Sequence, residues 1–202
     1  MKAFSNIKEI VCAKEWKYLV LNTLPVNIAD TYSFSESMQV IDQLVEASAD
    51  ETLKDGFSAD LMREYSVNLM TVLQAKYPNE WRNDWKNQAF LGVLCGLVFR
   101  EEEAFIHIQN AFEQLEDPPQ SLILAFISAG SGPDNFLSKE QVLKLSRKAI
   151  EKGVTYESAL NLATLAYEQQ DFEGQKYWEE MASEAKTRGE HTPNITPDVL
   201  SK

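Results

Sequence analysis

The chain has 202 residues, 44% of them apolar, which is enough to bury a hydrophobic core in one domain or in a compact pair of subdomains. Its 31 acidic residues exceed its 19 lysines and arginines, so the formal net charge of −12 opposes binding to a nucleic-acid backbone and favours a basic protein partner. The same charge also suits a protein that only needs to stay soluble, and this simpler explanation stays open.

The cysteines and the apolar segments exclude further classes. Cys12 and Cys95 have no second Cys or His at ligand spacing, which argues against a disulfide framework and against a zinc site. The opening MKAFSNIKEI lacks the pattern of a secretory signal, and the longest apolar run, residues 91–99, is far shorter than the roughly 20 residues that span a bilayer. We therefore expect a cytoplasmic protein that does not bind a membrane.

Apolar residues recur at three- and four-residue spacings through most of the chain, whereas period-two alternation is weak, so we predict an all-α protein. Three helices are expected in the N-terminal part. The first lies in residues 6–22, before a proline; the second, in residues 33–47, could be capped by Ser35; the third, in residues 58–77, could be capped by Ser58 and ended by Pro78. Residues 1–80 are assigned to an N-terminal helical segment.

From residue 81 onward the apolar pattern indicates paired helices that repeat. The first helices of three units align at Leu91, Leu124 and Leu162, which are 33 and 38 residues apart. The second helices of the first two units align at 38 residues. The residues aligned in those second helices are Ala104, Phe105, Ala111 and Phe112 with Val142, Leu143, Ala149 and Ile150. Both alignments hold if five residues were inserted once, at the turn-rich segment GSGPD of residues 130–134.

This pattern resembles the tetratricopeptide repeat, a helix–turn–helix of about 34 residues that stacks because one unit cannot bury its apolar face alone. The family's Leu, small residues and closing Ala are met by Leu162, Ala163, Ala166 and Ala182. The resemblance covers residues 84–187 and implies an all-α helical hairpin stack, an α-solenoid, with the N-terminal segment packed on it. We expect three such units in residues 81–187 and a loosely held polar tail in residues 188–202, all in one compact unit.

The sequence offers little for catalysis. His107 and His191 are the only candidate bases, and they lie beside an apolar helix stripe and in the tail, respectively. Glu101, Glu102 and Glu103 do not converge on one ion, because successive helical residues point about 100° apart. We therefore expect no enzymatic activity, no catalytic or metal site and no cofactor, and a small-molecule ligand is not indicated.

The resemblance also implies a binding surface, since ligands of this family lie in the groove lined by the first helix of each unit. Carried onto this chain, the groove residues are Lys86, Ala89, Val93, Leu122, Phe126, Leu160, Thr164 and Tyr167. Phe126, Tyr167, Trp81 and Trp85 are the expected aromatic anchors, and the run of Glu101, Glu102 and Glu103 contributes an acidic rim. Val93 and Phe126 stand where the family's clamp for a terminal carboxylate needs Asn, so an apolar groove is favoured.

These features predict a non-enzymatic protein-binding module. A dedicated inhibitor fits best, similar in general character to the immunity proteins that bacteria make against basic toxin domains or effectors. Two alternatives stay open. One is a general tetratricopeptide-like adaptor in a larger assembly, and the other is an enzyme whose carboxylates come from distant helices.

Overall fold

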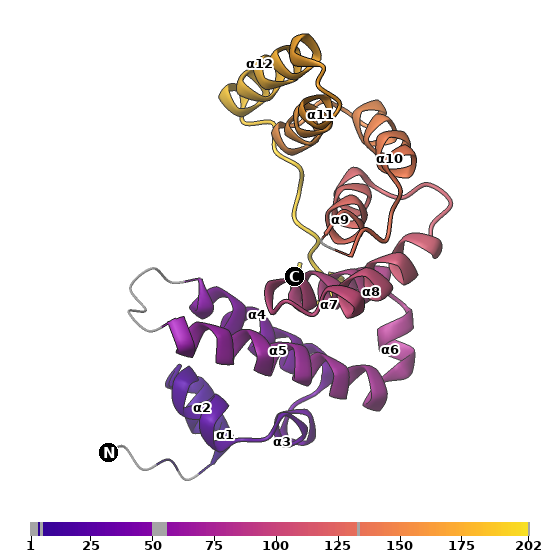
Figure 1. Cartoon of the computed structure of the whole chain (residues 1–202). Coiled ribbons are helices and arrows are strands. Elements are labelled where there is room, and N and C mark those ends of the chain that lie inside the picture. Colours follow the sequence, from indigo (N-terminus) through magenta and orange to yellow (C-terminus); the bar gives the residue numbers. More distant parts are fainter. Residues whose placement is uncertain (1–3, 5, 50–55, 133, 202) are drawn as a thin grey trace. The chain divides into compact units, whose positions relative to one another are not determined.

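The computed structural model describes residues 4, 6–49, 56–132 and 134–201, and this part of the chain contains twelve α-helices, one short 3-10 helix and no β-strand (Figure 1). The prediction of an all-α protein is confirmed. The chain forms two compact units, Met1–Arg100 with Thr196–Lys202 and Glu101–Ile195, which we call unit 1 and unit 2. Among the described residues, no helix is both long enough and apolar enough to cross a membrane.

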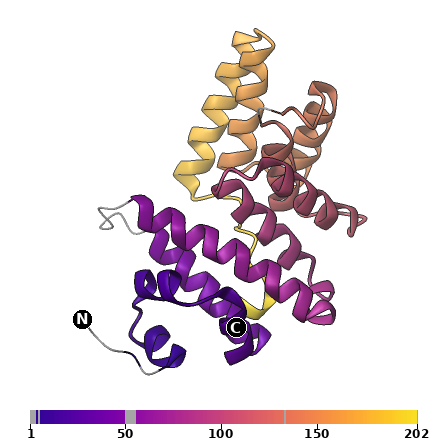
Figure 2. The ribbon, with the colours of Figure 1, turned by 60° about the horizontal axis from the view of Figure 1, so that its bottom comes forward.

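Unit 1 is organised around its longest helix, α5. Its elements are α1 (Ile7–Cys12), α2 (Trp16–Asn22), α3 (Pro25–Thr31), α4 (Phe34–Ser48), α5 (Gly56–Lys76), α6 (Pro78–Arg82), α7 (Trp85–Leu97) and the 3-10 helix η1 (Asp198–Leu200). Helices α2, α3, α4, α6 and α7 all pack against α5, and α4 lies beside it in both views (Figures 1 and 2). The fully buried side chains include Leu19, Ile28, Met38, Ile41, Leu44, Leu69, Met70, Leu73, Leu91 and Leu94.

The helix ends of unit 1 differ in detail from the prediction. The segment 6–22 forms two helices, because the chain turns at Lys14, whose φ is 55°. Ser33, and not Ser35, caps α4, since its hydroxyl accepts from the Glu36 backbone N–H while the Glu36 carboxylate accepts from the Ser33 backbone N–H. Ser58 lies inside α5 and is not a cap. A new helix does begin at Pro78, as a proline at the first helical position favours.

Unit 2 is a chain of helices in which each packs on the next. Its elements are α8 (Glu101–Glu113), α9 (Gln120–Gly130), α10 (Lys139–Glu151), α11 (Tyr156–Glu168) and α12 (Phe172–Arg188). The contact between α11 and α12 is the most extensive. Small side chains explain it, because helices approach closely where side chains are short. The buried alanines on these two helices are Ala159, Ala163, Ala166, Ala182 and Ala185.

Burial shows how positions in α7, α9 and α11 correspond. Leu91 in α7 and Leu162 in α11 are both buried, but Leu124 in α9 is only half-buried. Leu124 lies between two buried pairs, Leu122 with Ile123 and Phe126 with Ile127. The leucines begin the second such buried group in α7 and in α11, so Phe126 is their equivalent. The predicted alignment of α9 is therefore wrong by two residues. Equivalent positions are 35 and 36 residues apart, and the first residues of α7, α9 and α11 have the same spacing.

The connection in which an insertion was predicted is longer than the other two. Residues 98–100 join α7 to α8 and residues 169–171 join α11 to α12, whereas residues 131–138 join α9 to α10, a connection five residues longer. One residue of this segment, Pro133, lies outside the described residues. The predicted correspondence of the second helices also agrees with burial, because the buried residues of α8 and α10 are 38 residues apart. They are Ala104, Ile108 and Ala111 in α8 and Val142, Ser146 and Ala149 in α10.

The tail is held at two places, residues 190–192 and Asp198, contrary to the prediction of a loose segment. Within unit 2, the Glu190 carbonyl accepts from the Tyr156 backbone N–H at 2.9 Å. Within unit 1, η1 packs on α4. Asp198 makes two further contacts, one through its backbone N–H and one through its carboxylate. The Asp198 N–H donates to Asp84 at 2.7 Å, and its carboxylate lies 2.6 Å from the Lys86 ammonium. The composition of the tail did not reveal these partners, because they lie far away in sequence.

Candidate functional site

Several residues predicted to line a groove belong to the core. Ala89 and Leu122 are fully buried, and Phe126 is also buried, packed between the rings of Phe105 and Phe112 at centroid distances of 5.5 and 4.7 Å. Trp81, a predicted anchor, is buried as well and donates its indole N–H to a glutamine side chain at 2.7 Å. These residues stabilise the fold, and their side chains are not presented to a partner.

The predicted groove residues of α7 lie in unit 1 and do not form one surface. Lys86 is half-buried, and its ammonium is paired with Asp198 of the tail. Val93 is exposed, with 36% of its surface accessible, while Ala89 points into the core. Trp85 is half-buried at the start of the helix. Only Val93 of this set is free to contact another molecule.

The acidic rim is located at the start of α8. Glu101, Glu102 and Glu103 all lie in the first turn, where negative charge interacts favourably with the helix dipole. Glu102 and Glu103 are exposed and Glu101 is half-buried. The stabilisation of α8 is therefore sufficient to explain the three acids. They are also far in sequence from the predicted groove residues of α11.

The remaining predicted residues form one solvent-facing line on α11. Leu160, Thr164 and Tyr167 are spaced four and three residues apart, so they share a helix face, and all three are exposed. Leu160 is 43% exposed and Tyr167 is 60% exposed. We call these three residues the α11 stripe. The opposite face of α11 carries the small residues that pack on α12, so the stripe is directed outward by the same packing that holds the hairpin together.

Beyond the stripe, the turn between α11 and α12 presents a second aromatic ring. Phe172, the first residue of α12, is 65% exposed, and residues 167–173 are exposed throughout. We call residues 167–173 the hairpin tip. Its shape is fixed by Gln170, which has a φ of 61°, and by the Asp171 N–H, which donates to the Ala166 carbonyl at 2.9 Å. Asp171 also accepts from the Gly174 N–H at 2.9 Å and so caps α12.

A groove of about 230 Å³ borders the stripe within unit 2. Its lining comes from α9, α10, α11 and the long connection between α9 and α10. Ile127, Val142 and Leu165 are buried side chains in it, and Thr164 belongs both to this lining and to the α11 stripe. Asn161 also faces the groove, and its Oδ1 accepts from the Ser146 hydroxyl at 2.5 Å. The groove therefore has apolar walls and a polar edge beside the exposed stripe.

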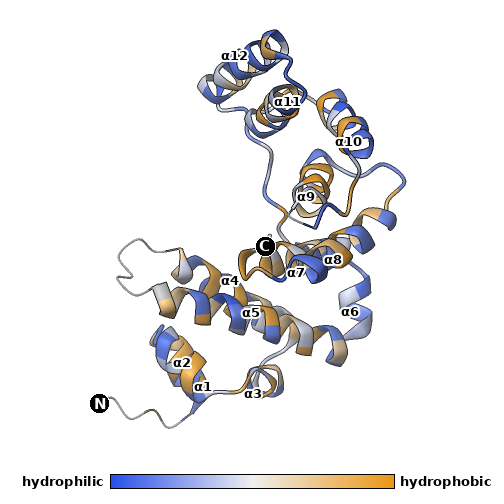
Figure 3. Ribbon diagram, in the orientation of Figure 1, coloured by the Kyte–Doolittle hydropathy of each residue, from blue (hydrophilic) through white to orange (hydrophobic). Residues whose placement is uncertain are grey.

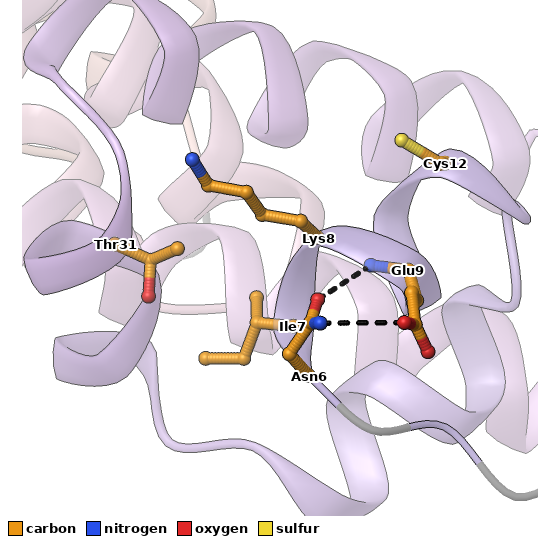
Figure 4. A pocket seen from close by; sticks show the side chains of 6 residues that line it. All are labelled: Asn6, Ile7, Lys8, Glu9, Cys12 and Thr31. Atoms are coloured by element: carbon orange, nitrogen blue, oxygen red, sulfur yellow. Dashed lines mark hydrogen bonds between the residues drawn. The ribbon is translucent and has the colours of Figure 1, made fainter.

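A larger and more open depression, of about 660 Å³, lies on α1 in unit 1 (Figure 4). Asn6 caps α1 there, since its Oδ1 accepts from the Glu9 N–H at 3.1 Å, and Lys8 and Thr31 border it from two helices. Cys12, also in the lining, is exposed and makes no disulfide. Sequence reasoning missed this depression, because its residues carry no chemical pattern.

The two histidines have separate structural surroundings. Burial lowers the pKa of the half-buried His107 imidazole, and the nearby Glu103 partly opposes this shift. The neutral ring is therefore favoured at physiological pH. The His191 Nδ1 lies 2.8 Å from the Glu157 carboxylate, which also accepts from the Thr192 backbone N–H at 2.8 Å. This cluster attaches the tail to the start of α11.

No family model matches the chain, and neither a curated protein nor a solved structure matches it. The described part of the chain is all-α and consists of packed helix pairs. Its binding properties must follow from its own surface. On that surface, the α11 stripe, the hairpin tip and the adjoining groove are the features of unit 2 that combine exposed apolar side chains with a hollow.

Proposed function

We propose that this protein is a cytoplasmic, non-enzymatic binding module built from tetratricopeptide-like hairpins, and that it is a dedicated inhibitor of a basic protein. The immunity proteins that bacteria make against toxin domains are the nearest functional comparison. The observation that carries the proposal is the α11 stripe. Leu160 and Tyr167 are exposed to solvent on a regular helix. Clustered exposed apolar surface marks interaction sites.

The geometry of two turns supports the hairpin part of the proposal. Phe99 and Gln170 hold equivalent places after α7 and α11, with φ values of 60° and 61°. The Arg100 N–H donates to the Cys95 carbonyl at 2.9 Å, and the Asp171 N–H donates to the Ala166 carbonyl at the same distance. Two segments 71 residues apart therefore turn in the same way, as expected of a repeated unit.

Affinity capture from the native host tests the proposal. The full chain should retain one basic protein in a one-to-one complex, and retention should fall steeply as salt is raised, because screening weakens attraction between a protein of charge −12 and a basic partner. The Tyr167→Ala variant should retain less of the same protein. Several weakly held proteins would favour the adaptor instead, and the absence of any retained protein would contradict a binding role.

A further inference from the structure

We infer that the α11 stripe and the hairpin tip together form the docking face for a basic amphipathic helix of the partner, with an arginine of that helix located at the tip. This inference rests on the proposed function and specifies its partner. It concerns only unit 2, where the residues of the face lie on one hairpin.

The apolar part of the face has the dimensions of a helix contact. Leu160 and Tyr167 are seven residues apart, so the stripe is about 10 Å long, which corresponds to two turns of a partner helix. The groove beside Thr164 has buried apolar walls and can accept one side chain from that helix. Helices that dock into such surfaces place apolar residues at intervals of three and four, which matches the spacing of the stripe.

The α11 stripe and the hairpin tip carry charge of one sign, although Lys139 lines the adjoining groove. Between Lys152 and Lys176 the sequence contains no lysine or arginine, but it contains four acids, of which Glu168, Asp171 and Glu173 lie in the hairpin tip. Glu168 and Glu173 make no ion pair within the part of the chain that the structure describes. They can therefore pair with a cation from another molecule.

The cations of α12, by contrast, already have partners in unit 2. Lys176 lies 4.0 Å from Glu180, Arg188 lies 2.8 Å from Glu190, and Lys186 is 5.3 Å from the centre of the Tyr156 ring. The three acids of the tip also outnumber Lys176, the cation of α12 that is nearest to them in sequence, so the charge at residues 167–173 is negative.

Two aromatic rings make arginine the favoured cation. Tyr167 and Phe172 are both more than half exposed, and they flank a three-residue turn. A guanidinium group stacks on aromatic faces and also binds carboxylates through several N–H donors, whereas an ammonium acts as a point charge. The alternation of rings and carboxylates in the tip suits the planar group.

Other occupants are disfavoured by charge. A second copy of this chain would bring its own net charge of −12 and the same acidic tip, so the two faces would repel each other. A nucleic-acid backbone and an anionic lipid surface would be repelled for the same reason. A basic polypeptide is the remaining class of ligand, and its attraction is to the acidic hairpin tip.

A synthetic peptide tests this inference directly. The probe is a helical peptide with Leu on one face and Arg on the other, and its matched partner has Glu in place of Arg. Fluorescence anisotropy with the full chain should show binding of the basic peptide only. Tyr167→Ala should weaken binding about tenfold, as loss of an aromatic anchor does. The double variant Glu168→Gln/Glu173→Gln should weaken it about threefold to tenfold at low salt.

Matched variants separate the docking face from general attraction. Glu113→Gln/Glu116→Gln removes two exposed acids elsewhere in unit 2 and changes the net charge equally, and Ile106→Ala removes an exposed apolar residue of α8. Both should change binding less than about twofold. Equal losses in the control and tip variants, binding of the acidic peptide, or no binding of the basic peptide would overturn the inference. If the Tyr167→Ala variant still retains the host protein, the proposed function stands, but the partner does not bind at this face.

Discussion

Tyr65 on α5 illustrates how single buried polar atoms affect the stability of unit 1. Its side chain is buried, and its hydroxyl has no hydrogen-bond partner among the described residues. Burial also raises the pKa of this phenol well above its ordinary value. A buried hydroxyl without a partner is destabilising, because its hydrogen bonds to water are lost and not replaced.

Replacing Tyr65 by Phe should therefore raise the free energy of unfolding by about 1 kcal/mol. Tyr77→Phe is the matched control, because the Tyr77 hydroxyl donates to the carbonyls of Ala29 and Tyr32 at 3.4 Å, and its removal should be neutral or destabilising. Urea unfolding of both variants measures the difference. A destabilised Tyr65→Phe variant would mean that the hydroxyl has a favourable role.

Glu157 should make the attachment of the tail depend on pH. Burial by itself would raise the pKa of this carboxyl, but the hydrogen bonds from the Thr192 backbone N–H and from His191 outweigh it and lower the pKa overall. A carboxyl with a lowered pKa in the folded state stabilises that state above its ordinary pKa of about 4.3, and the contribution is lost as pH falls through the folded value.

The Thr192 amide should accordingly be protected from hydrogen exchange at neutral pH and lose protection as pH falls below the ordinary titration range of a glutamate. In Glu157→Gln the amide keeps a neutral acceptor, so its protection should be weaker at neutral pH and should vary less with pH. Protection factors from nuclear magnetic resonance give the comparison. A wild-type protection factor that is the same on both sides of this range would refute the role of Glu157.

The candidate site could be predicted only in part from single residues. Leu160, Thr164 and Tyr167 are exposed as a binding surface requires, but Ala89, Leu122 and Phe126 are core residues. An apolar residue at helical spacing is equally compatible with a groove and with a core, so composition cannot separate the two. Phe172 was missed for the converse reason, since nothing in its sequence neighbours distinguishes an exposed ring from a buried one.

At the scale of elements, the longer helices were predictable, whereas the short helices α3 and α6 and the register of α9 were not. Apolar residues occupy most of α9, so several of its faces could have been the buried one (Figure 3). In α10, apolar and charged residues alternate at helical spacing, and the predicted correspondence with α8 agrees with burial at Val142 and Ala149. The length of the connection between α9 and α10 was also predictable, because Gly130 and the residues after it favour a turn.

The end of α9 offers a test of this connection. A Cβ placed on Gly130 would collide with the side chain of Leu137, which is buried, so Gly130→Ala should reduce the free energy of unfolding by about 1–3 kcal/mol. Gly132→Ala is the matched control, because its Cβ would meet Glu101 only at 3.6 Å, an ordinary contact. Thermal unfolding should separate the two variants. Equal melting temperatures would show that α9 does not end against Leu137.

At the scale of the whole molecule, the chain consists of two compact helical units, and the tail contributes residues to both. The contacts divide the chain into two compact units and not into the single one expected. The tetratricopeptide-like arrangement and the absence of catalysis stay predictions. The predicted boundary after residue 80 is not where the contacts divide, since α7 packs with unit 1. Local pattern could not reveal this, because the packing of α7 on α5 depends on residues distant in sequence.

The most direct test of the account is a nuclear magnetic resonance titration of the isotope-labelled full chain with the basic protein that it retains. The account predicts that amide shifts concentrate on α11 and on residues 167–173 at stoichiometric addition, and that raising the salt concentration reverses them. Shifts concentrated in unit 1, for example around Ile7–Cys12, with α11 unchanged, would contradict it.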